Sequence, residues 1–386
     1  MTEMAKDKDL GGIFKLSTQM FAENYHKAVN NVLNNPAPDS PLYPYACQFQ
    51  HNTANLAAWK AYRLANELTS LTNDEDIKLA IKKYNQWQAV EYNAITARTR
   101  TARQLLDFKK RANIYPNLKW VRSRSANPRE GHLSLVGLVL PYNDPFWASN
   151  QPGSLYGCKC DWVQTDEPVS GQIPEAVTPS PGLDGNPLLT GELITRKAGH
   201  FKAYANKNIV PQIIECLGEN QWTNFKAKDG FNLQTHLLHG SLELKENIEM
   251  INLFSSVNKD IASCKLLPII YKDEQNIKKA FYPKKQYPLD VRRNADALIT
   301  MKDGQEWVTD FKITTGNNLK RILSDAAKQA KYAVIKLEAN SEVKIDEIKG
   351  RVDYITESKR LNEVFVFDHA GILVYKASKN TTAEKQ

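Results

Sequence analysis

Three charged residues in the C-terminal third of this 386-residue chain have types and spacing that could perform chemistry together. Asp310 and Lys312 stand two residues apart in a pattern that predicts a β-strand, so their side chains share one face. A turn at residues 302–305 would place a preceding strand, and with it Asp296, alongside. Two carboxylates about 4 Å apart repel by roughly 4 kcal/mol at an effective dielectric constant of about 20, so their approach needs a proton or a cation. The spacing therefore predicts a divalent metal site beside a lysine.

The helices and strands expected around these residues indicate an α/β domain with a mixed sheet over residues 241–380. Ser241 is the expected N-cap of a helix over 241–257, and the charged residues lie on a hairpin expected over 294–313. The other expected elements are a strand over 265–270, a helix over 317–332, a strand over 333–337, a helix over 343–360 and strands over 363–367 and 372–375. Alternating helices and strands are typical of α/β architecture.

A basic segment directly before Asp296 is a candidate nucleic-acid contact. Its bases are interleaved with aromatic residues that could stack on nucleobases, and Lys284, Lys285, Arg292 and Arg293 are the candidates for phosphate contacts. The formal net charge of +8 and the pI of about 9.0 favour an acidic partner in the same way. The alternative is a solvated basic surface with no ligand.

The order of acid, Asp-x-Lys and a Gln-bearing helix resembles the PD-(D/E)xK nuclease superfamily. It is more closely similar to the C-terminal tRNA-nuclease domains of contact-dependent growth inhibition toxins, which also have a Leu-Leu-Pro strand, found here at 266–268. Ala295 stands where the proline of the superfamily name would precede Asp296. The resemblance implies a restriction-endonuclease-like fold, in which Gln329 would hold the attack geometry or a phosphate.

The same resemblance implies the roles of the charged residues. Asp296, Asp310 and an acid of the preceding helix would bind Mg²⁺ or another divalent cation. Glu249 is the expected helix acid and Glu246 the second choice. Lys312 would orient or help deprotonate the attacking water and screen the developing negative charge.

Two other interpretations of this region stay open at the level of sequence. The three charged residues of the hairpin could form a surface salt-bridge ladder without catalysis. Alternatively, His236 and His239 could serve a metal-free ribonuclease as general base and acid, although a structural or surface role is the favoured interpretation of histidines at the end of an element.

Three short motifs follow one another in the N-terminal half. They are Arg-Glu-Gly-His at 129–132, Asp-Pro-Phe-Trp at 144–147 and Gly-Cys-Lys-Cys at 157–160. Their order resembles the phage Mu protein F-like, or head-morphogenesis, domain, although Lys159 stands where Arg is usual. The resemblance covers roughly residues 80–163 and implies an α+β phage head-protein-like domain, mostly helical at its start.

Metal binding is one interpretation of the thiols in this motif. Cys158, Cys160 and His132 could supply three soft ligands to zinc. Two cysteines separated by one residue lack the usual spacing, however, and no fourth ligand is evident. The alternative is a pair of buried thiols beside a hydrogen-bonded histidine. The 144–147 motif indicates a turn that pins an aromatic side chain.

Helical patterns are expected before these motifs, over 49–71 and 74–111, with Asn73 as the N-cap of the second. Six bases on this second helix could contact nucleic acid or form a solvated face: Arg98, Arg100, Arg103, Lys109, Lys110 and Arg111.

Prolines and glycines gather at 164–195, which predicts a linker. The expected division is a helical region with a phage-like domain over 1–163, this linker, a connecting region over 196–240 and the nuclease domain over 241–380. No apolar run approaches the roughly 20 residues of a membrane span, and no signal peptide is apparent. Five scattered cysteines favour reduced thiols, so the expected location is a bacterial cytoplasm or a phage virion.

Together the two resemblances imply a phage-encoded polymorphic toxin in which a head-protein-like module carries a tRNA-cleaving nuclease. Such a toxin would need a cognate immunity protein, and its head-like part would meet phage head or portal components. The alternatives are a structural minor capsid protein and a protein that binds nucleic acid without cutting it.

Overall fold

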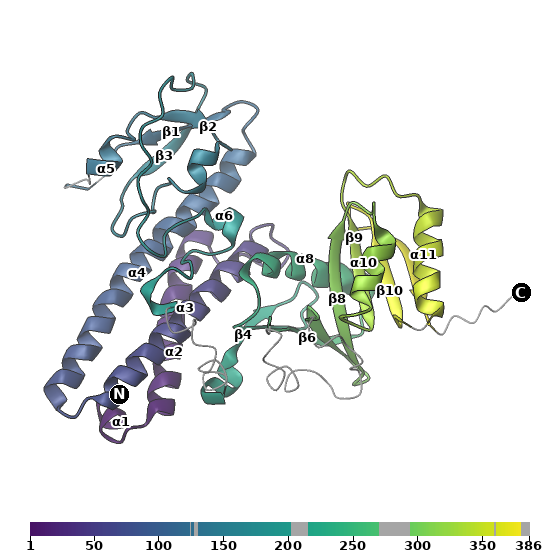
Figure 1. Cartoon of the computed structure of the whole chain (residues 1–386), viewed down its shortest axis with the longest axis horizontal. Helices are drawn as coiled ribbons and strands as arrows, with labels where there is room; N and C mark the ends of the chain where they lie inside the picture. The colour runs from purple at the N-terminus through teal and green to yellow at the C-terminus, as the bar shows by residue number, and fades with distance from the viewer. Residues whose placement is uncertain (124, 127–129, 202–214, 270–293, 359, 380–386) are drawn as a thin grey trace, which may run out of the picture. The chain divides into compact units, whose positions relative to one another are not determined.

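The structure, a computed structural model, describes residues 1–123, 125–126, 130–201, 215–269, 294–358 and 360–379. The chain forms two compact units, Met1–Gln221 and Trp222–Gln386 (Figure 1). The architecture is α+β, with helices first and a mixed sheet in the second unit, as expected. The predicted phosphate contacts at Lys284, Lys285, Arg292 and Arg293 lie outside the described residues. Across the described ranges, no helix is long and apolar enough to cross a membrane.

Unit 1 begins with helices, as the sequence predicts. They are α1 (Thr2–Lys6), α2 (Leu10–Leu33), α3 (Tyr43–Ser70) and α4 (Asp74–Lys109). The Asn73 side chain accepts a hydrogen bond from the Asp76 backbone N–H at 2.8 Å, which confirms the predicted N-cap of α4. Pro44 occupies the first turn of α3, where its missing N–H costs nothing.

A charged group lies inside these helices. Lys60 has no exposed surface, and its Nζ is 2.6 Å from Glu91 Oε2. The other Glu91 oxygen lies 2.7 Å from His200 Nε2, and the Tyr25 hydroxyl donates to Glu91 as well. The aromatic ring of Phe21 lies 4.6 Å from the ammonium. A buried charge needs such partners because it has lost its hydration.

The second part of unit 1 is a small antiparallel sheet with short helices. Its elements are β1 (Asn117–Val121), α5 (Glu130–Leu133), β2 (Val139–Pro141), η1 (Pro145–Ala148), β3 (Asp161–Thr165), α6 (Pro187–Thr190) and η4 (Gly218–Gln221), with strand order β2-β1-β3. Trp120, Trp147 and Trp162 form its core. The Asp144 carboxylate accepts from the Phe146 N–H at 2.8 Å, which confirms the predicted turn that pins an aromatic side chain.

The segment expected to be a linker, residues 164–195, packs inside unit 1. Arg98, predicted to lie on a basic helix face, is completely buried and donates to the carbonyls of Leu183 at 2.6 Å and Gly185 at 2.8 Å. The Asn52 side chain holds the backbone N–H of Leu193 at 2.9 Å. The prolines here therefore shape a packed loop, and the division between the units falls after residue 221.

Unit 2 is one eight-stranded mixed sheet with three helices among its described residues. Its elements are β4 (Trp222–Lys226), β5 (Asn232–His236), α8 (Ser241–Val257), β6 (Ile261–Leu266), β7 (Ala297–Met301), β8 (Glu306–Thr314), α10 (Leu319–Ala326), β9 (Tyr332–Leu337), α11 (Ile345–Glu357), β10 (Glu363–Phe367) and β11 (Leu373–Ser378). The unit begins earlier than the predicted boundary at 241, because β4 and β5 belong to the same sheet.

The strand order is β11-β10-β9-β8-β7-β6-β5-β4. The pairings make β5, β6, β8, β9 and β10 run in one direction, while β4, β7 and β11 run in the other. The carboxyl ends of five strands therefore meet at one edge of the sheet. In open α/β sheets this edge is where ligands bind.

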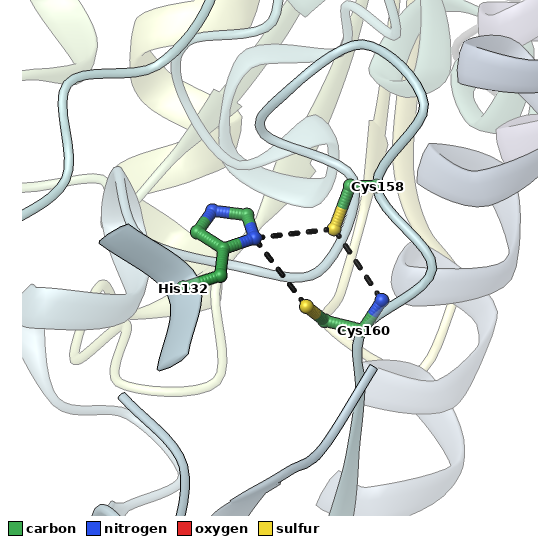
Figure 2. Close-up of side chains that lie close together, drawn as sticks. All are labelled: His132, Cys158 and Cys160. Atoms are coloured by element: carbon green, nitrogen blue, oxygen red, sulfur yellow. Dashed lines mark hydrogen bonds between the residues drawn. The ribbon is translucent and has the colours of Figure 1, made fainter. Parts of the chain in front are cut away.

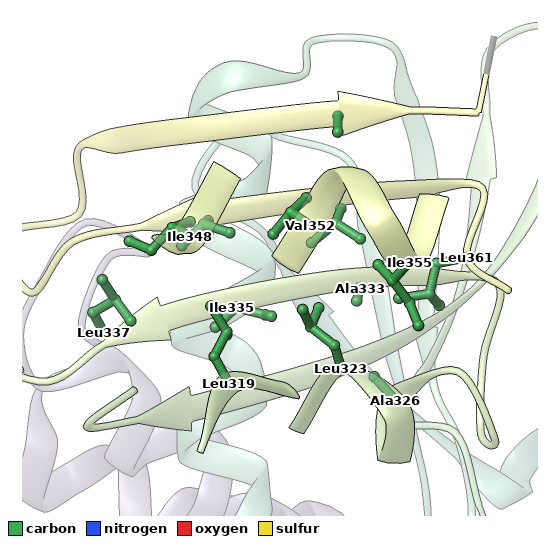
Figure 3. Packing of buried hydrophobic residues seen from close by; sticks show 13 residues of the cluster. Leu319, Leu323, Ala326, Ala333, Ile335, Leu337, Ile348, Val352, Ile355 and Leu361 are labelled. Atoms are coloured by element: carbon green, nitrogen blue, oxygen red, sulfur yellow. The ribbon is translucent and has the colours of Figure 1, made fainter. Parts of the chain in front are cut away.

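Helices cover both faces of this sheet. On one face, α10 and α11 pack against alternate residues of β9 and β10, such as Ala333 and Ile335 (Figure 3). On the other face, Phe254 of α8 lies 4.8 Å from the Phe365 ring and 6.2 Å from the Trp307 ring. Successive side chains of a strand point to opposite faces of the sheet. Ala333 and Ile335 therefore face α10 and α11, whereas Phe365 and Trp307 face α8.

Element boundaries differ from the predicted ones where turns were not recognised. The α8 helix begins at Ser241, but Gly240 is its N-cap residue and no side chain caps it. The α10 helix ends at Ala326, six residues before the predicted end at 332. The hairpin of β7 and β8 is confirmed, and Gly304 supplies the left-handed backbone, with φ of 84°, that its turn requires.

Candidate active site at the carboxyl edge of the mixed sheet

Asp296 is held between two strands at the carboxyl edge. Its N–H donates to the Thr309 carbonyl of β8 at 3.2 Å, and its carbonyl accepts from the Leu267 N–H, just after β6, at 2.8 Å. Its carboxylate Oδ2 accepts from the Phe311 N–H at 2.7 Å. These three backbone bonds fix the position of the Asp296 side chain beside β8.

Asp310 and Lys312 share one face of β8, as the sequence predicts. Lys312 Nζ donates a hydrogen bond to Asp310 Oδ1 at 2.8 Å and lies 2.8 Å from Oδ2. Asp310 has no exposed surface, and its Oδ2 lies in the ion pair with Lys312 without a well-aligned hydrogen bond from the residues that the structure describes. The buried carboxylate therefore has Lys312 beside it but is not fully hydrogen-bonded.

The charges around Asp310 favour a positively charged partner for its carboxylate. Burial, together with the neighbouring charge of Asp296, raises the pKa of Asp310 well above its ordinary value, and Lys312 offsets this only in part. Burial lowers the pKa of Lys312, but the carboxylates of Asp310 and Asp296 outweigh it, so the lysine pKa is raised. Lys312 is therefore an ammonium at neutral pH. This state suits orienting water and screening charge, but it does not suit the predicted role of removing a proton.

The helix acid that lies near this group is Glu243, in the first turn of α8. Its charge contributes to the raised pKa of Lys312 and acts on the His239 imidazole. The topology explains this placement: α8 follows β5, so its first turn starts at the carboxyl edge. A Cβ on Gly240 would lie 3.3 Å from Glu243 Oε2, so the glycine leaves room for this carboxylate.

Glu249, the expected helix acid, is placed elsewhere. It lies six residues after Glu243, about 9 Å farther along the helix axis, and it pairs with Lys245 of the same helix at 2.8 Å. Glu246, the second choice, is exposed and has no ion pair among the residues described. The signal that could have found Glu243 is the helix start itself, because a first-turn acid is the one nearest the end of the preceding strand.

Gln329 is not brought into this group. It lies after the end of α10, and its side-chain amide donates a long hydrogen bond of 3.4 Å to the Asp325 carbonyl. Within the described ranges no contact joins it to Asp310 or Lys312. The expected role of Gln329 in holding a phosphate therefore has no support in its placement.

The two histidines of the alternative mechanism are structural. His239 donates from Nδ1 to the Leu267 carbonyl at 2.7 Å, and its Nε2 faces the Asn247 amide at 3.2 Å. Burial lowers its pKa, so the ring is neutral. His236 Nδ1 accepts from the Leu238 N–H at 3.0 Å. Because both rings are buried and hold backbone groups, they are poorly placed to exchange protons with a substrate.

The donor set fits a hard divalent cation. Mg²⁺ prefers carboxylate oxygens and is commonly held by one or two of them, with water completing its shell. Asp296 and Asp310 supply two such groups, and the buried Oδ2 of Asp310 has no well-aligned hydrogen bond among the described residues. The carboxylates of Asp296, Asp310 and Glu243 are not all within 4.8 Å of one another, so the three do not form one compact ligand set.

No protein-family model, curated protein or solved structure matches the chain. Its function must therefore be argued from the geometry and chemistry of its own residues.

Proposed function

We propose that unit 2 is a metal-dependent nuclease that hydrolyses phosphodiester bonds, with tRNA as its substrate. The observation that carries this proposal is the completely buried Asp310 carboxylate, which has the second carboxylate of Asp296 close by and whose charge Lys312, 2.8 Å away, offsets only in part. A buried carboxylate next to a second one is costly unless a cation offsets the charge. Its position at the carboxyl edge of the sheet supports a binding role.

Each residue of the site would have a separate role in this reaction. Asp296 and Asp310 would hold a divalent cation such as Mg²⁺, which supplies Lewis acidity and neutralises phosphate charge when bound. Lys312, kept as an ammonium by its carboxylate neighbours, would stabilise the negative charge that develops on the phosphate. The backbone N–H of Phe311 keeps Asp296 oriented, and Glu243 would accept hydrogen bonds from water at the site.

The wider biological role is proposed from the motifs. The phage head-like motifs of unit 1 and the Asp-x-Lys of unit 2 support a phage-encoded polymorphic toxin that carries its nuclease as cargo. The preference for tRNA, the cognate immunity protein and the contact with phage head or portal components follow from the same resemblance. The metal chemistry itself serves RNA and DNA equally.

The test is a cleavage assay on the full chain. Total tRNA and duplex DNA are incubated with the protein in Mg²⁺ and in EDTA, with Asp310→Asn and Lys312→Ala as variants. We expect Mg²⁺-dependent cleavage of tRNA that falls by about 100-fold or more in each variant, because each removes charge from the reacting centre. Asp229→Asn is the matched control, since Asp229 forms a more exposed ion pair with Lys259 at 3.0 Å in the same unit.

The outcomes separate the competing functions. Cleavage of duplex DNA alone would keep the site and change the substrate. Unchanged cleavage in both variants would refute the site. Binding of RNA without degradation of either polymer would favour a protein that binds nucleic acid without cutting it, and neither binding nor degradation would favour a structural minor capsid protein.

A further inference from the structure

Three potential metal ligands converge in unit 1. The Nδ1 atom of His132 lies 3.5 Å from Cys158 Sγ and 3.3 Å from Cys160 Sγ (Figure 2). All three ligand atoms lie within 4.8 Å of one another, and they form the one such set of three or more His, Cys, Asp or Glu groups in the part of the chain that the structure describes. His132 is buried and both cysteines are half-buried.

The spacing agrees with tetrahedral zinc. Bond lengths of about 2.3 Å to sulfur and about 2.05 Å to nitrogen at the tetrahedral angle place a sulfur and a nitrogen ligand about 3.6 Å apart, and two sulfurs about 3.8 Å apart. The two distances to Nδ1 are close to this value. Two thiolates and an imidazole are also the ligand types that zinc prefers.

Contacts with the surrounding protein orient the ligand side chains. Cys158 Sγ accepts hydrogen bonds from the N–H groups of Gly153 and Cys160, each at 3.4 Å, which stabilises a thiolate in the way that outer contacts tune metal-bound sulfur. The His132 ring packs edge-to-face against Trp120, with centroids 5.3 Å apart, so its direction is set by the aromatic core. The ligands are therefore oriented by contacts that do not involve a metal.

Three protein ligands leave a fourth position for water. Cys158 and Cys160 line a cavity of about 450 Å³, whose wall also carries the polar side chains of Thr101, Gln104 and Asp161. Three protein ligands and one water are the usual arrangement of catalytic zinc sites, whereas structural sites usually have four protein ligands. The cavity supplies space for that water on the cysteine side of the cluster.

We propose that His132 Nδ1, Cys158 Sγ and Cys160 Sγ bind one Zn²⁺ ion that ties α5 to the loop before β3. Sequence alone left this open, because the Cys-x-Cys spacing is unusual and no fourth ligand is evident. The fold nevertheless brings the three ligands together, since α5 carries His132 to both sulfurs. The inference does not depend on the nuclease proposal, which concerns unit 2.

The first test is the metal content of the full chain purified without chelators. We expect about one zinc ion per chain, and on replacement by Co²⁺ we expect the visible bands of tetrahedral cobalt together with sulfur-to-cobalt charge transfer. Both signals should be absent in Cys158→Ser and Cys160→Ser, and zinc affinity should fall by more than about 100-fold in His132→Asn. Cys216→Ser is the matched control, because Cys216 is a half-buried thiol outside the cluster, and it should retain full zinc content.

A second measurement uses the unaltered protein, so it does not depend on the variants folding. Alkylation of Cys158 and Cys160, followed by mass spectrometry, should be slow in the purified chain and at least about 10-fold faster after phenanthroline removes zinc, because a metal-bound thiolate is protected. The proposal is overturned if the unaltered chain holds no zinc and gives no cobalt spectrum when Co²⁺ is added. Equal alkylation rates with and without chelator would also overturn it.

Discussion

Lys312 Nζ lies 2.8 Å from the carboxylate of Asp310, a residue with no exposed surface. Breaking such a buried pair is costly, yet the intact pair adds little stability compared with apolar residues of similar volume. Asp296 adds a second negative charge near Asp310, and Lys312 offsets the effect of burial and of this charge only in part. Stability alone explains the pair poorly, which supports the proposal that the carboxylates receive a cation during function.

Asp310→Asn tests the electrostatic cost at this site. Because the pKa of Asp310 is raised in the folded chain, proton binding favours the fold: this stability is full below the unfolded-state pKa and is lost as pH rises through the folded-state pKa. In EDTA, the melting temperature of the wild type should therefore fall relative to that of Asp310→Asn as the pH rises above about 4, the ordinary pKa of an aspartate. Thermal denaturation at a series of pH values measures it. Parallel curves would contradict the raised pKa.

Glu243→Gln and Glu249→Gln form a matched pair on one helix. Because Glu243 acts on Lys312 at the carboxyl edge while Glu249 pairs with Lys245, we expect tRNA cleavage to fall by about 10-fold or more in the first and to stay within about twofold in the second. Initial cleavage rates at saturating Mg²⁺ give the comparison. A larger loss in Glu249→Gln would restore that residue as the helix acid.

Gly240→Ala tests whether the position of Glu243 matters. The new methyl would lie 2.9 Å from Ile269 Cδ1 and 3.3 Å from Glu243 Oε2, so the ends of both side chains must move. Cleavage should fall by roughly 3- to 10-fold, and the melting temperature should fall modestly, since backbone at φ of −67° accepts alanine but alanine is a poorer N-cap than glycine. Gly350→Ala, where nothing lies within 4 Å of the added Cβ, is the control. Equal rates in both variants would show that Glu243 needs no such room.

Glu91→Ala tests the buried charge in unit 1. Removing this carboxylate leaves Lys60 buried without its anionic partner, which should cost about 3 to 5 kcal/mol in the free energy of unfolding. Glu67→Ala breaks the more exposed pair with Lys83 and should cost less than about 1 kcal/mol. Urea denaturation followed by circular dichroism measures both. Similar losses in the two variants would contradict the structural importance of the buried group.

Structural features that depend only on residues close together in the sequence could be predicted from local patterns. The hairpin and the shared face of Asp310 and Lys312 follow from the two-residue period of a strand, and Asn73 was recognisable as a cap because its partner is three residues away. The helix of α8 was predicted within the same bounds, 241–257. These features need no knowledge of the tertiary fold.

Long-range contacts account for what could not be predicted. Glu243, Glu246 and Glu249 look alike in the sequence, and only the path from β5 into α8 shows which turn begins at the carboxyl edge. Residues 164–195 have the composition of a linker, but Arg98, more than 80 positions earlier, holds the Leu183 and Gly185 carbonyls inside unit 1. Amino-acid composition does not show which distant residues a segment contacts.

Calorimetric titration of the full chain with Mg²⁺ tests the central claim most directly, because it asks whether the buried carboxylate is a metal ligand without requiring a substrate. We expect saturable binding of about one ion per wild-type chain, at least about 10-fold weaker in Asp310→Asn and unchanged in Asp229→Asn. The zinc cluster should not interfere, because its thiolate ligands do not suit Mg²⁺. Equal Mg²⁺ affinity in the wild type and in Asp310→Asn, or no saturable binding to the wild type, would contradict the account.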